Sequence, residues 1–352
     1  MRTGMTDGLP PAATAAHLTD VLRRAGVLGR AAVREVTVES ARSTIMSRIT
    51  RLRLSYDGAT DGAPESLFLK TRLTERARNH YAGGRQEVAF YSIVAPQMNA
   101  GLVPRCFDAQ WDAETDDWHL LLEDLTDTHV PPSTWPLPPN LAQCEQIIGA
   151  RARFHAAWWG DARLGASVGT LRDAAALDQL VQDLRGHFRS FADALPPERR
   201  GIYERLCDAA PRLFERYRAR HSLTLVHGDA HVWNCFLPRD GGGDVRLFDW
   251  DGWRVGVAAT DLAYMMAVHW YPDRRRRCER TLLDHYHATL LAEGVRDYDR
   301  RALSEDYQWA VLWQITTPVW QAAFNVPPVI WWNNMERVLL AFDGLGCREL
   351  LA

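Results

Sequence analysis

The hydrophobic pattern of this 352-residue chain changes near residue 124, and this change constrains the fold more than any other feature of the sequence. Before residue 124, apolar and polar residues alternate over 33–56, as in two antiparallel strands, and three further strand-like stretches follow at 67–71, 105–111 and 118–123. A period of two is typical of strands with one buried face. After residue 124, a proline-rich stretch leads into long helical patterns. The sequence therefore predicts an α+β, two-lobed fold with a small β-rich lobe and a large helical lobe.

We place the boundary between the lobes after residue 124, so that residues 1–124 form the first lobe and 125–352 the second. One predicted helix, at 85–94, crosses the β-rich part. The helical part has patterns that predict helices at about 141–159, 172–195, 197–220, 281–293, 301–320 and from 331 onward. A single strand–loop–strand segment, residues 223–250, is set among these helices.

Composition excludes several classes of protein. Hydrophobic residues make up 47% of the chain, which is enough for two real cores, and the net charge of −3 indicates no nucleic-acid partner. No run of about 18 apolar residues suggests a membrane span, and the first eleven residues do not resemble a secretory signal. The six cysteines are scattered without a Cys-x-x-Cys pair, so neither a zinc site nor a disulfide framework is expected. We expect a protein of the reducing cytoplasm.

The chain contains a single lysine, Lys70, among its 41 basic residues. A chain that uses arginine for almost every positive charge would keep a lysine where a compact ammonium is required and a planar fork does not fit. The alternative is that one lysine survived by chance on a solvated strand. Composition alone leaves both interpretations open.

The segment 223–250 carries the strongest chemical signal in the sequence. Its polar residues lie on a loop between two apolar stretches, and a glycine-rich turn at 241–243 is expected to bring a second acidic stretch back beside that loop. The two stretches read His227-Gly228-Asp229-Ala230-His231-Val232-Trp233-Asn234 and Phe248-Asp249-Trp250.

Phosphoryl transfer requires the types of residue found in this segment. A carboxylate must orient the attacking hydroxyl, and the metal on the triphosphate needs oxygen ligands such as a carboxylate and an amide. Asp229, Asn234 five residues later and Asp249 twenty residues after the first supply these groups. The spacing predicts Asp229 as the catalytic base or orienting group, with Asn234 and Asp249 as magnesium ligands.

Two other interpretations of the segment stay open. Aspartate and asparagine are common in turns, so the segment could be a hairpin with polar turns. His227, Asp229 and His231 also alternate as zinc ligands sometimes do, which would make the protein a metal-dependent hydrolase.

The motif His-Gly-Asp-x-His-x-x-Asn followed by Phe-Asp-Trp resembles the aminoglycoside phosphotransferase and choline kinase superfamily, which has a protein-kinase-like fold. The variant is most similar to the branch that includes ecdysteroid-kinase-like proteins. The resemblance extends from about residue 33 to the C-terminus. It implies an enzyme that uses ATP, or GTP as the alternative, with Mg²⁺, and it makes residues 1–124 a nucleotide-binding lobe and residues 125–352 a catalytic and substrate-binding lobe.

The resemblance also implies roles for residues outside the segment. Lys70 resembles the lysine that binds the α- and β-phosphates of the nucleotide, and Glu87 resembles the helix glutamate that pairs with it. The stretch 121–125 resembles the hinge, where backbone groups near Glu123 and Leu125 would bind the adenine edge. Asp261 resembles a structural aspartate behind the catalytic loop, although a simple helix cap would explain it equally well.

The sequence departs from protein kinases at the loop that would cover the phosphates. Protein kinases place glycines there, whereas residues 40–46 contain none, and Ser43 and Thr44 would supply amides and hydroxyls instead. Small-molecule kinases of this superfamily often lack those glycines. The departure therefore favours a small-molecule acceptor over a protein substrate.

The acceptor is expected to be a hydroxyl compound: an antibiotic, a sugar, a choline-like alcohol or another metabolite. His231, Trp250 and Trp313 are the candidates for contacting it, since aromatic side chains can stack on a flat group or hold a cation. A core position is the alternative for Trp313. A nucleotide-binding module that keeps the fold without transferring phosphate is the alternative for the whole protein, and we expect a monomer or a homodimer.

Nucleotide binding is the first consequence of this interpretation that can be measured. We expect ATP with Mg²⁺ to raise the melting temperature Tm of the protein in a thermal-shift assay. Asp249→Ala should abolish the Mg²⁺-dependent part of that shift, because the main metal ligand is lost. Unchanged affinity for Mg²⁺–ATP in Asp249→Ala would contradict the assignment.

Overall fold

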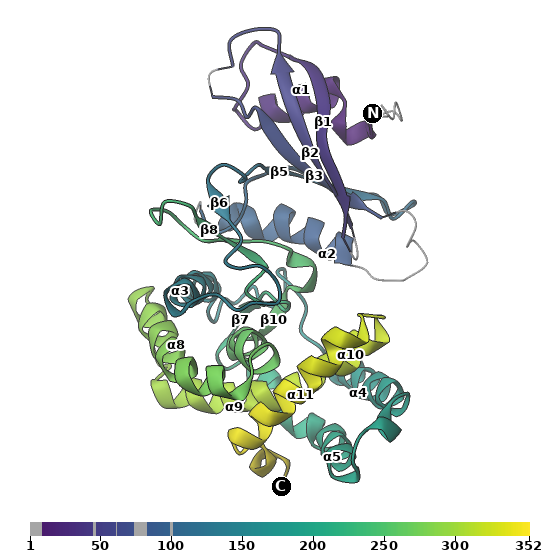
Figure 1. Ribbon diagram of the computed structural model, residues 1–352, viewed down its shortest axis with the longest axis vertical. Coiled ribbons are helices and arrows are strands. Elements are labelled where there is room, and N and C mark those ends of the chain that lie inside the picture. Colours follow the sequence, from purple (N-terminus) through teal and green to yellow (C-terminus); the bar gives the residue numbers. More distant parts are fainter. Residues whose placement is uncertain (1–8, 45–46, 61, 74–82, 99–100) are drawn as a thin grey trace. The chain divides into compact units, whose positions relative to one another are not determined.

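The computed structural model describes residues 9–44, 47–60, 62–73, 83–98 and 101–352 (Figure 1). The chain forms two compact units. The first unit consists of Met1–Val130 together with Pro238–Asp251, and the second consists of Pro131–Leu237 together with Gly252–Ala352. The mixed α+β fold, β-rich toward the N-terminus and helical toward the C-terminus, confirms the predicted fold class.

A five-stranded antiparallel sheet is the centre of the first unit, and its order is β1-β2-β3-β5-β4. The strands that the sequence predicted are all present. They are β1 (Val33–Ser43), β2 (Ser47–Tyr56), β3 (Ser66–Arg72), β4 (Cys106–Trp111) and β5 (Trp118–Glu123). Ile49, which breaks the apolar alternation of β2, lies in register with Lys70. Its side chain therefore points to the face opposite that of Leu52 and Leu54.

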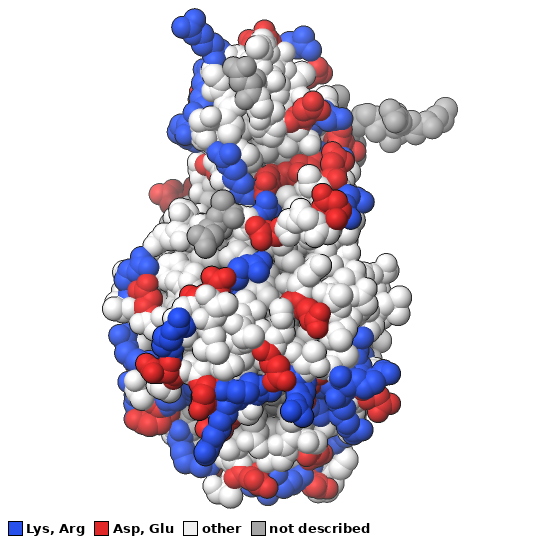
Figure 2. Space-filling view, turned by 90° about the vertical axis from the view of Figure 1, so that its left-hand side faces the viewer, with Lys and Arg blue, Asp and Glu red and all other residues white. Residues whose placement is uncertain are grey.

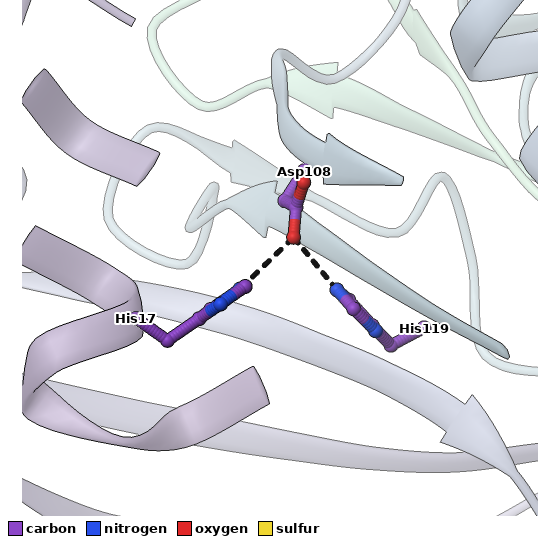
Figure 3. Close-up of side chains that lie close together, drawn as sticks. All are labelled: His17, Asp108 and His119. Carbon is purple, nitrogen blue, oxygen red and sulfur yellow. Dashed lines mark hydrogen bonds and ion pairs between the residues drawn. The ribbon is translucent and has the colours of Figure 1, made fainter. Parts of the chain in front are cut away.

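Helix α1 (Ala15–Arg24) covers one face of this sheet. Leucines and valines from the helix form one core cluster with Leu52, Leu67, Leu69 and Leu121 of the strands. The helix stops before Gly26, whose φ of 71° is a conformation that glycine adopts without strain. A polar contact also joins α1 to this face, since the His17 Nε2 lies 2.9 Å from the Asp108 carboxylate of β4 (Figure 3).

Helix α2 (Gly83–Ala89) begins beside β5, where a Cβ atom added at Gly84 would lie 2.0 Å from the Trp118 indole nitrogen. The helix continues as one wide turn, η3 (Phe90–Val94), which buries Phe90 and Val94. The predicted helix at 85–94 is therefore present but changes its hydrogen-bonding pattern half-way.

The segment Pro238–Asp251 belongs to the first unit although it follows most of the helical part in sequence. Arg239 donates to the Thr126 carbonyl at 2.9 Å, and the His129 Nε2 lies 3.1 Å from the Asp244 carbonyl. The Leu247 amide of β9 (Arg246–Leu247) donates to the Leu102 carbonyl. The two compact units therefore do not follow one single boundary in the sequence. These hydrogen bonds tie the distant segment Pro238–Asp251 to the first unit.

The second unit is mainly helical. Its helices are α3 (Leu141–Ala157), α4 (Ala174–Arg189), α5 (Pro197–Leu213), α6 (Glu215–Ala219), α7 (Ala259–Ala263), α8 (Pro272–Ala292), α9 (Arg300–Gln314), α10 (Thr317–Ala323) and α11 (Pro328–Gly344). Two antiparallel strands, β7 (Leu223–Val226) and β10 (Arg254–Val257), lie among them.

Short elements complete both units. The strands are β6 (His129–Val130), in the first unit, and β8 (Cys235–Pro238). The short helical turns are η1 (Pro11–Ala13), η4 (Ala95–Gln97), η5 (Ala192–Ala194), η6 (Trp250–Gly252), η7 (Tyr264–Val268) and η8 (Cys347–Leu351).

Helix ends follow from local sequence, and two of them correct the predictions. The predicted helix at 281–293 begins nine residues earlier, at Pro272, since its four consecutive arginines hide the apolar period that would reveal the start. The predicted helix at 301–320 is two helices, because α9 ends at Gln314 and Pro318 lies in the first turn of α10.

None of the described helices combines the length and the apolar character that crossing a bilayer requires. Acidic and basic side chains are interspersed on the face shown in Figure 2.

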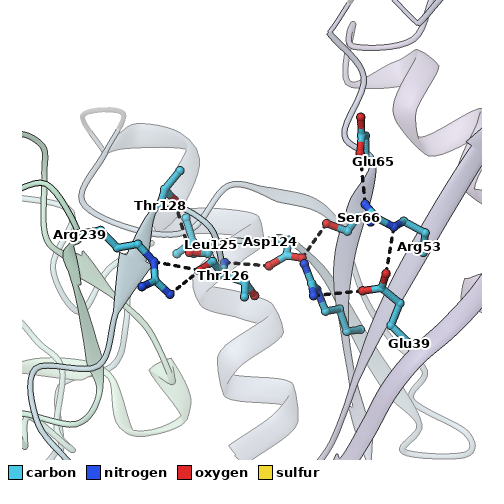
Figure 4. Close-up of polar contacts among 10 residues, drawn as sticks. Glu39, Arg53, Glu65, Ser66, Asp124, Leu125, Thr126, Thr128 and Arg239 are labelled. Atoms are coloured by element: carbon cyan, nitrogen blue, oxygen red, sulfur yellow. Dashed lines mark hydrogen bonds and ion pairs between the residues drawn. The ribbon is translucent and has the colours of Figure 1, made fainter.

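Asp124 joins three segments of the first unit at the end of β5 (Figure 4). Its side chain is only 5% exposed and accepts hydrogen bonds from the Arg51 guanidinium and the Ser66 hydroxyl, both at 2.6 Å, and from the Thr126 amide. Burial alone would raise the pKa of Asp124, but these donors outweigh it and hold the pKa below its ordinary value of 3.8. The carboxylate is therefore charged in the folded protein.

We expect Asp124→Asn to lower the free energy of unfolding by about 1–3 kcal/mol at neutral pH, because a charged acceptor is replaced by a neutral amide. The stabilisation from the depressed pKa is complete above 3.8 and is lost as the pH falls through the lower folded-state pKa. The difference between wild type and variant should therefore narrow below about pH 4. Denaturant unfolding at several pH values measures the free energy of unfolding of both proteins. A difference between wild type and variant that does not change with pH would contradict this account.

Candidate active site

Lys70 lies between two carboxylates in the first unit. Its ammonium is 2.7 Å from Glu87 of α2 and 2.5 Å from Asp249, which follows β9. The side chains of Lys70 and Glu87 are 12% and 2% exposed, so the pair is largely out of water. The contact between Lys70 and Glu87 that the sequence analysis expected is present, whereas its role in binding a nucleotide stays a prediction.

The charges of this group depend on one another. Burial alone would lower the pKa of Lys70, but Asp249 and Glu87 outweigh it and hold the pKa above its ordinary value. Burial raises the pKa of Glu87, while Lys70 opposes that effect. Lys70 therefore stays protonated. Its positive charge reduces the repulsion between the Glu87 and Asp249 carboxylates, which can then lie close together.

Asp249 has an unusual backbone conformation, with a φ of 67° in the left-handed region. Residues other than glycine rarely adopt it, although aspartate tolerates it better than most, and such conformations concentrate at functional sites. The next residue, Trp250, is fully buried, stacks on the Phe90 ring at 3.9 Å and donates to the Leu247 carbonyl. Trp250 thus anchors the segment that presents Asp249. This burial does not favour the substrate contact that was predicted for Trp250.

The second unit holds the loop between β7 and β8 in a tight conformation. Asn234 donates through its side-chain amide to both the carbonyl and the carboxylate of Asp229, at 2.9 Å and 3.0 Å. The His231 Nε2 lies 3.5 Å from the same carboxylate. The structure therefore brings Asp229, His231 and Asn234 together, and the carbonyl oxygen of the Asn234 side chain is the atom that could bind a metal.

Asp229 is a carboxylate in an environment that favours its charge. Burial alone would raise its pKa, but His231, a hydrogen bond from Tyr264 and the nearby His227 and His269 outweigh it, and the pKa lies below its ordinary value. The pKa of His269 is also lowered, because the ring is buried and lies beside His231. A charged Asp229 can accept a proton from a hydroxyl, as a base or orienting group must.

Asp261 braces this loop from behind. Its carboxylate accepts the backbone amides of His227 and Gly228, at 2.7 Å and 3.1 Å, and lies 3.1 Å from the His155 ring. The opposite nitrogen of that ring lies 2.8 Å from the Tyr286 hydroxyl. The pKa of Asp261 is held well below its ordinary value by His155 and by its neighbours, despite burial. The bracing position that the sequence suggested for Asp261 is confirmed.

Sequence reasoning missed several residues that support the loop. Arg151 of α3 is 1% exposed and donates to the His231 carbonyl at 3.0 Å, while His155 and Tyr264 act as described above. An arginine in the middle of an apolar helical stretch was the available signal for Arg151. His155 carried no such signal, because its partners lie about a hundred or more residues away in the chain.

The zinc-hydrolase alternative gains no support from the loop. The His227 ring is buried, and its Nδ1 lies 3.3 Å from the Asp229 amide, which donates to it. Among the residues that the structure describes, the one group of three or more histidines, cysteines or acids with metal-like spacing contains neither His227 nor His231.

The other predicted site residues have local partners. The Thr44 hydroxyl contacts Ser47, and Ser43 is the last residue of β1. Residues 45–46 lie outside the described ranges. The Leu125 carbonyl accepts two backbone amides, and the Glu123 carboxylate accepts the Arg105 amide at 2.9 Å. Trp313 packs edge-on against Phe214, with ring centroids 4.5 Å apart, which places it against the core of the second unit.

Comparison with known families identifies the chain. Residues 43–296, more than half of its length, match the ecdysteroid kinase-like family. The chain belongs to this family. The match confirms the branch that the loop motif indicated, and it makes the chain a member of a kinase-like group of phosphotransferases. Comparison with the sequences of curated proteins finds no match.

Solved structures share the fold of this ecdysteroid kinase-like chain. The ethanolamine kinase of Plasmodium vivax is 11% identical with a TM-score of 0.56, and the match covers 88% of this chain and 83% of that one. The choline kinase of Cryptosporidium parvum Iowa II is 11% identical with a TM-score of 0.55, covering 90% of each chain. An aminoglycoside phosphotransferase of Streptomyces rimosus, solved with ADP and streptomycin, is 18% identical with a TM-score of 0.50, covering 86% and 97%.

Replacing Asp261 tests whether this residue holds the loop between β7 and β8. Asp261→Asn should lower the free energy of unfolding by about 3 kcal/mol or more, since a buried charged acceptor is lost beside two backbone amides. The amides of His227 and Gly228 should exchange faster with deuterated solvent than in wild type. Unchanged protection of these two amides would show that Asp261 does not hold the loop. Asp208→Asn, at an exposed position of α5, is the matched control.

Proposed function

We propose that this protein is an ATP- and Mg²⁺-dependent phosphotransferase that moves the γ-phosphate to a hydroxyl of a small molecule. The observation that supports this most is the position of Lys70, the single lysine of the chain, between Glu87 and Asp249. A lysine ammonium paired with a helix glutamate is the arrangement that protein kinases use in nucleotide binding.

Each residue has one role in the proposed reaction. Lys70 binds the α- and β-phosphates, and Glu87 orients its ammonium. Asn234 and Asp249 would supply oxygen ligands to Mg²⁺, and this donor set fits a hard cation that prefers carboxylate and amide oxygens. A metal held there would supply positive charge to the triphosphate. Asp229 accepts a hydrogen bond from the acceptor hydroxyl and takes its proton as the hydroxyl oxygen bonds to the γ-phosphorus; the bond from this phosphorus to the β-phosphate oxygen breaks, and ADP leaves.

The hinge supports nucleotide binding through its backbone. In the described ranges the Leu125 amide donates no hydrogen bond, whereas the Leu125 carbonyl is occupied by the Thr128 and His129 amides. We therefore assign the Leu125 amide, with a backbone group at Glu123, to the adenine edge. Ser43 and Thr44 are assigned to the phosphates.

The acceptor is a small alcohol in this proposal. The similar solved structures include a choline kinase, an ethanolamine kinase and an aminoglycoside phosphotransferase in complex with streptomycin, and all three compounds carry hydroxyl groups. His231, close to the Asp229 carboxylate, is the residue of the predicted set best placed to contact such a hydroxyl. The six cysteines are all free, which supports action in the reducing cytoplasm, as a monomer or a homodimer.

One observation favours a second candidate, a module that binds nucleotide without transferring phosphate. One of the two Asp249 carboxylate oxygens that could bind Mg²⁺ is held by Lys70 at 2.5 Å. A metal must displace this ammonium or take the other oxygen of the carboxylate. Binding of Mg²⁺–ATP without any consumption of ATP would support this candidate.

An ATP-consumption screen against hydroxyl-bearing metabolites and antibiotics identifies the acceptor, and Asp229→Asn then tests the mechanism. We expect the variant to lower kcat by about 10²–10⁴-fold, which is the usual contribution of a positioned acid or base. Its affinity for Mg²⁺–ATP and its Tm should stay near those of wild type. Asp208→Asn serves as control, because the Asp208 side chain is exposed and pairs with Arg185 on the surface of the second unit. Full turnover by Asp229→Asn would overturn the role of this residue.

A further inference from the structure

Three side chains of the first unit converge on one point outside the candidate active site. His17 of α1 and His119 of β5 both direct their Nε2 atoms at the same oxygen of Asp108 on β4 (Figure 3). The two distances are 2.9 Å and 2.8 Å, and the three potential ligand atoms all lie within 4.8 Å of one another. Each residue comes from a different element, so tertiary structure alone assembles the group.

We propose that His17, Asp108 and His119 form a binding site for a divalent transition metal of the zinc type, with water as the fourth ligand. Two imidazoles and one carboxylate are a ligand set that zinc uses in proteins. With metal–ligand bonds of about 2.0–2.1 Å, neighbouring ligands of a tetrahedral site lie about 3.3 Å apart. The histidine–carboxylate distances therefore need to open by only a few tenths of an ångström.

The surroundings of the carboxylate suit this role. The Gln110 side-chain amide lies 3.3 Å from both oxygens of Asp108 and can keep its hydrogen bond to the oxygen that faces away from the metal. The side chains of the three ligands are partly accessible, which gives an ion and its water a path to the site. Arg24 approaches the second oxygen, at 3.9 Å, but its side chain is 66% exposed and is free to turn into solvent.

The site is separate from the proposed nucleotide site. His119 pairs with Thr71 in the sheet, and Lys70 pairs with the next residue of β5, Leu120. Because neighbouring side chains on a strand point to opposite faces, His119 lies on the face covered by α1, and Lys70 lies on the other face. His17 also precedes the residues that match the family, 43–296. The metal would therefore clamp α1 to β4 and β5 without contacting the phosphate-binding group.

Zinc binding by the purified chain tests the proposal directly. The affinity tag must be removed, because polyhistidine binds zinc, and the protein must first be dialysed against a chelator. The probe is Zn²⁺ alone, measured as zinc per chain and by titration calorimetry, with Mg²⁺ as the comparison ion. We expect one Zn²⁺ per chain and, at about 100 times the dissociation constant, a rise in Tm of about 5 °C.

Variants locate the ion. Asp108→Asn and His17→Gln should each weaken zinc binding at least about tenfold, since each removes one of three protein ligands. Arg24→Ala should tighten it, because a competing positive charge is removed. His221→Gln, at an exposed position of the second unit, should bind zinc as wild type does. His17→Gln keeps the test valid if Asp108→Asn fails to fold.

Hydrogen exchange reports whether the metal acts as a clamp. Zn²⁺ should slow exchange of the α1 amides in wild type but leave them unchanged in His17→Gln. Two results would overturn the proposal. One is the absence of zinc binding by wild type, which would leave a cluster held by hydrogen bonds alone. The other is equal binding by wild type, Asp108→Asn and His17→Gln, which would place the ion elsewhere, including at the loop histidines.

Discussion

The ammonium of Lys70 holds two carboxylates together, and the arrangement of the first unit around it depends on that contact. Asp249 is 179 residues away from Lys70 in the chain. This pairing, the packing of Trp250 and the hydrogen bonds of Arg239 and Leu247 together bring it to β3. Removing one member of a buried ion pair typically costs about 3–5 kcal/mol, because the remaining charge is left without a partner. A lysine suits this position because its three donors can serve two carboxylates and still turn toward a phosphate.

The loop between β7 and β8 in the second unit is held by a series of buried hydrogen bonds and not by one ion pair. Asp261 accepts two backbone amides and contacts His155, which in turn contacts Tyr286. Buried polar groups of this kind stabilise one conformation when each has a partner. The loop can therefore present Asp229 as a charged side chain at a fixed position while the residues that hold it stay inside the helical core.

The sheet of the first unit carries two separate groups of polar side chains, one on each face, because a strand presents its side chains alternately. The inward leucines of β2, β3 and β5 form the core under α1, and His119 stands on that same face. Lys70 points to the other face, toward Glu87 of α2. A one-residue shift in register would exchange the two faces and destroy both groups, which ties the sites to the same pairing of β3 with β5.

Much of this could be predicted from local sequence. The period of two in residues 33–56 and the helical periods after residue 141 reflect one buried face, so they predicted the elements without knowledge of their partners. The loop motif grouped Asp229 with Asn234, and the structure brings these two side chains together, whereas their roles with Asp249 in phosphoryl transfer stay predictions. The start of α8 was missed because charged residues mask the apolar period, and the break before α10 was missed because a helix can continue past a proline as a kink.

The sequence by itself therefore determined the type and order of the elements, the single lysine and the residues of the loop. Tertiary structure alone decided several contacts between distant side chains that no local pattern records. Arg151 reaches the His231 carbonyl, Trp250 is buried against Phe90, and Asp108 receives two histidines from separate elements. The physical reason is that periodicity records how one segment faces a core, whereas a contact between distant side chains depends on the packing of the whole unit.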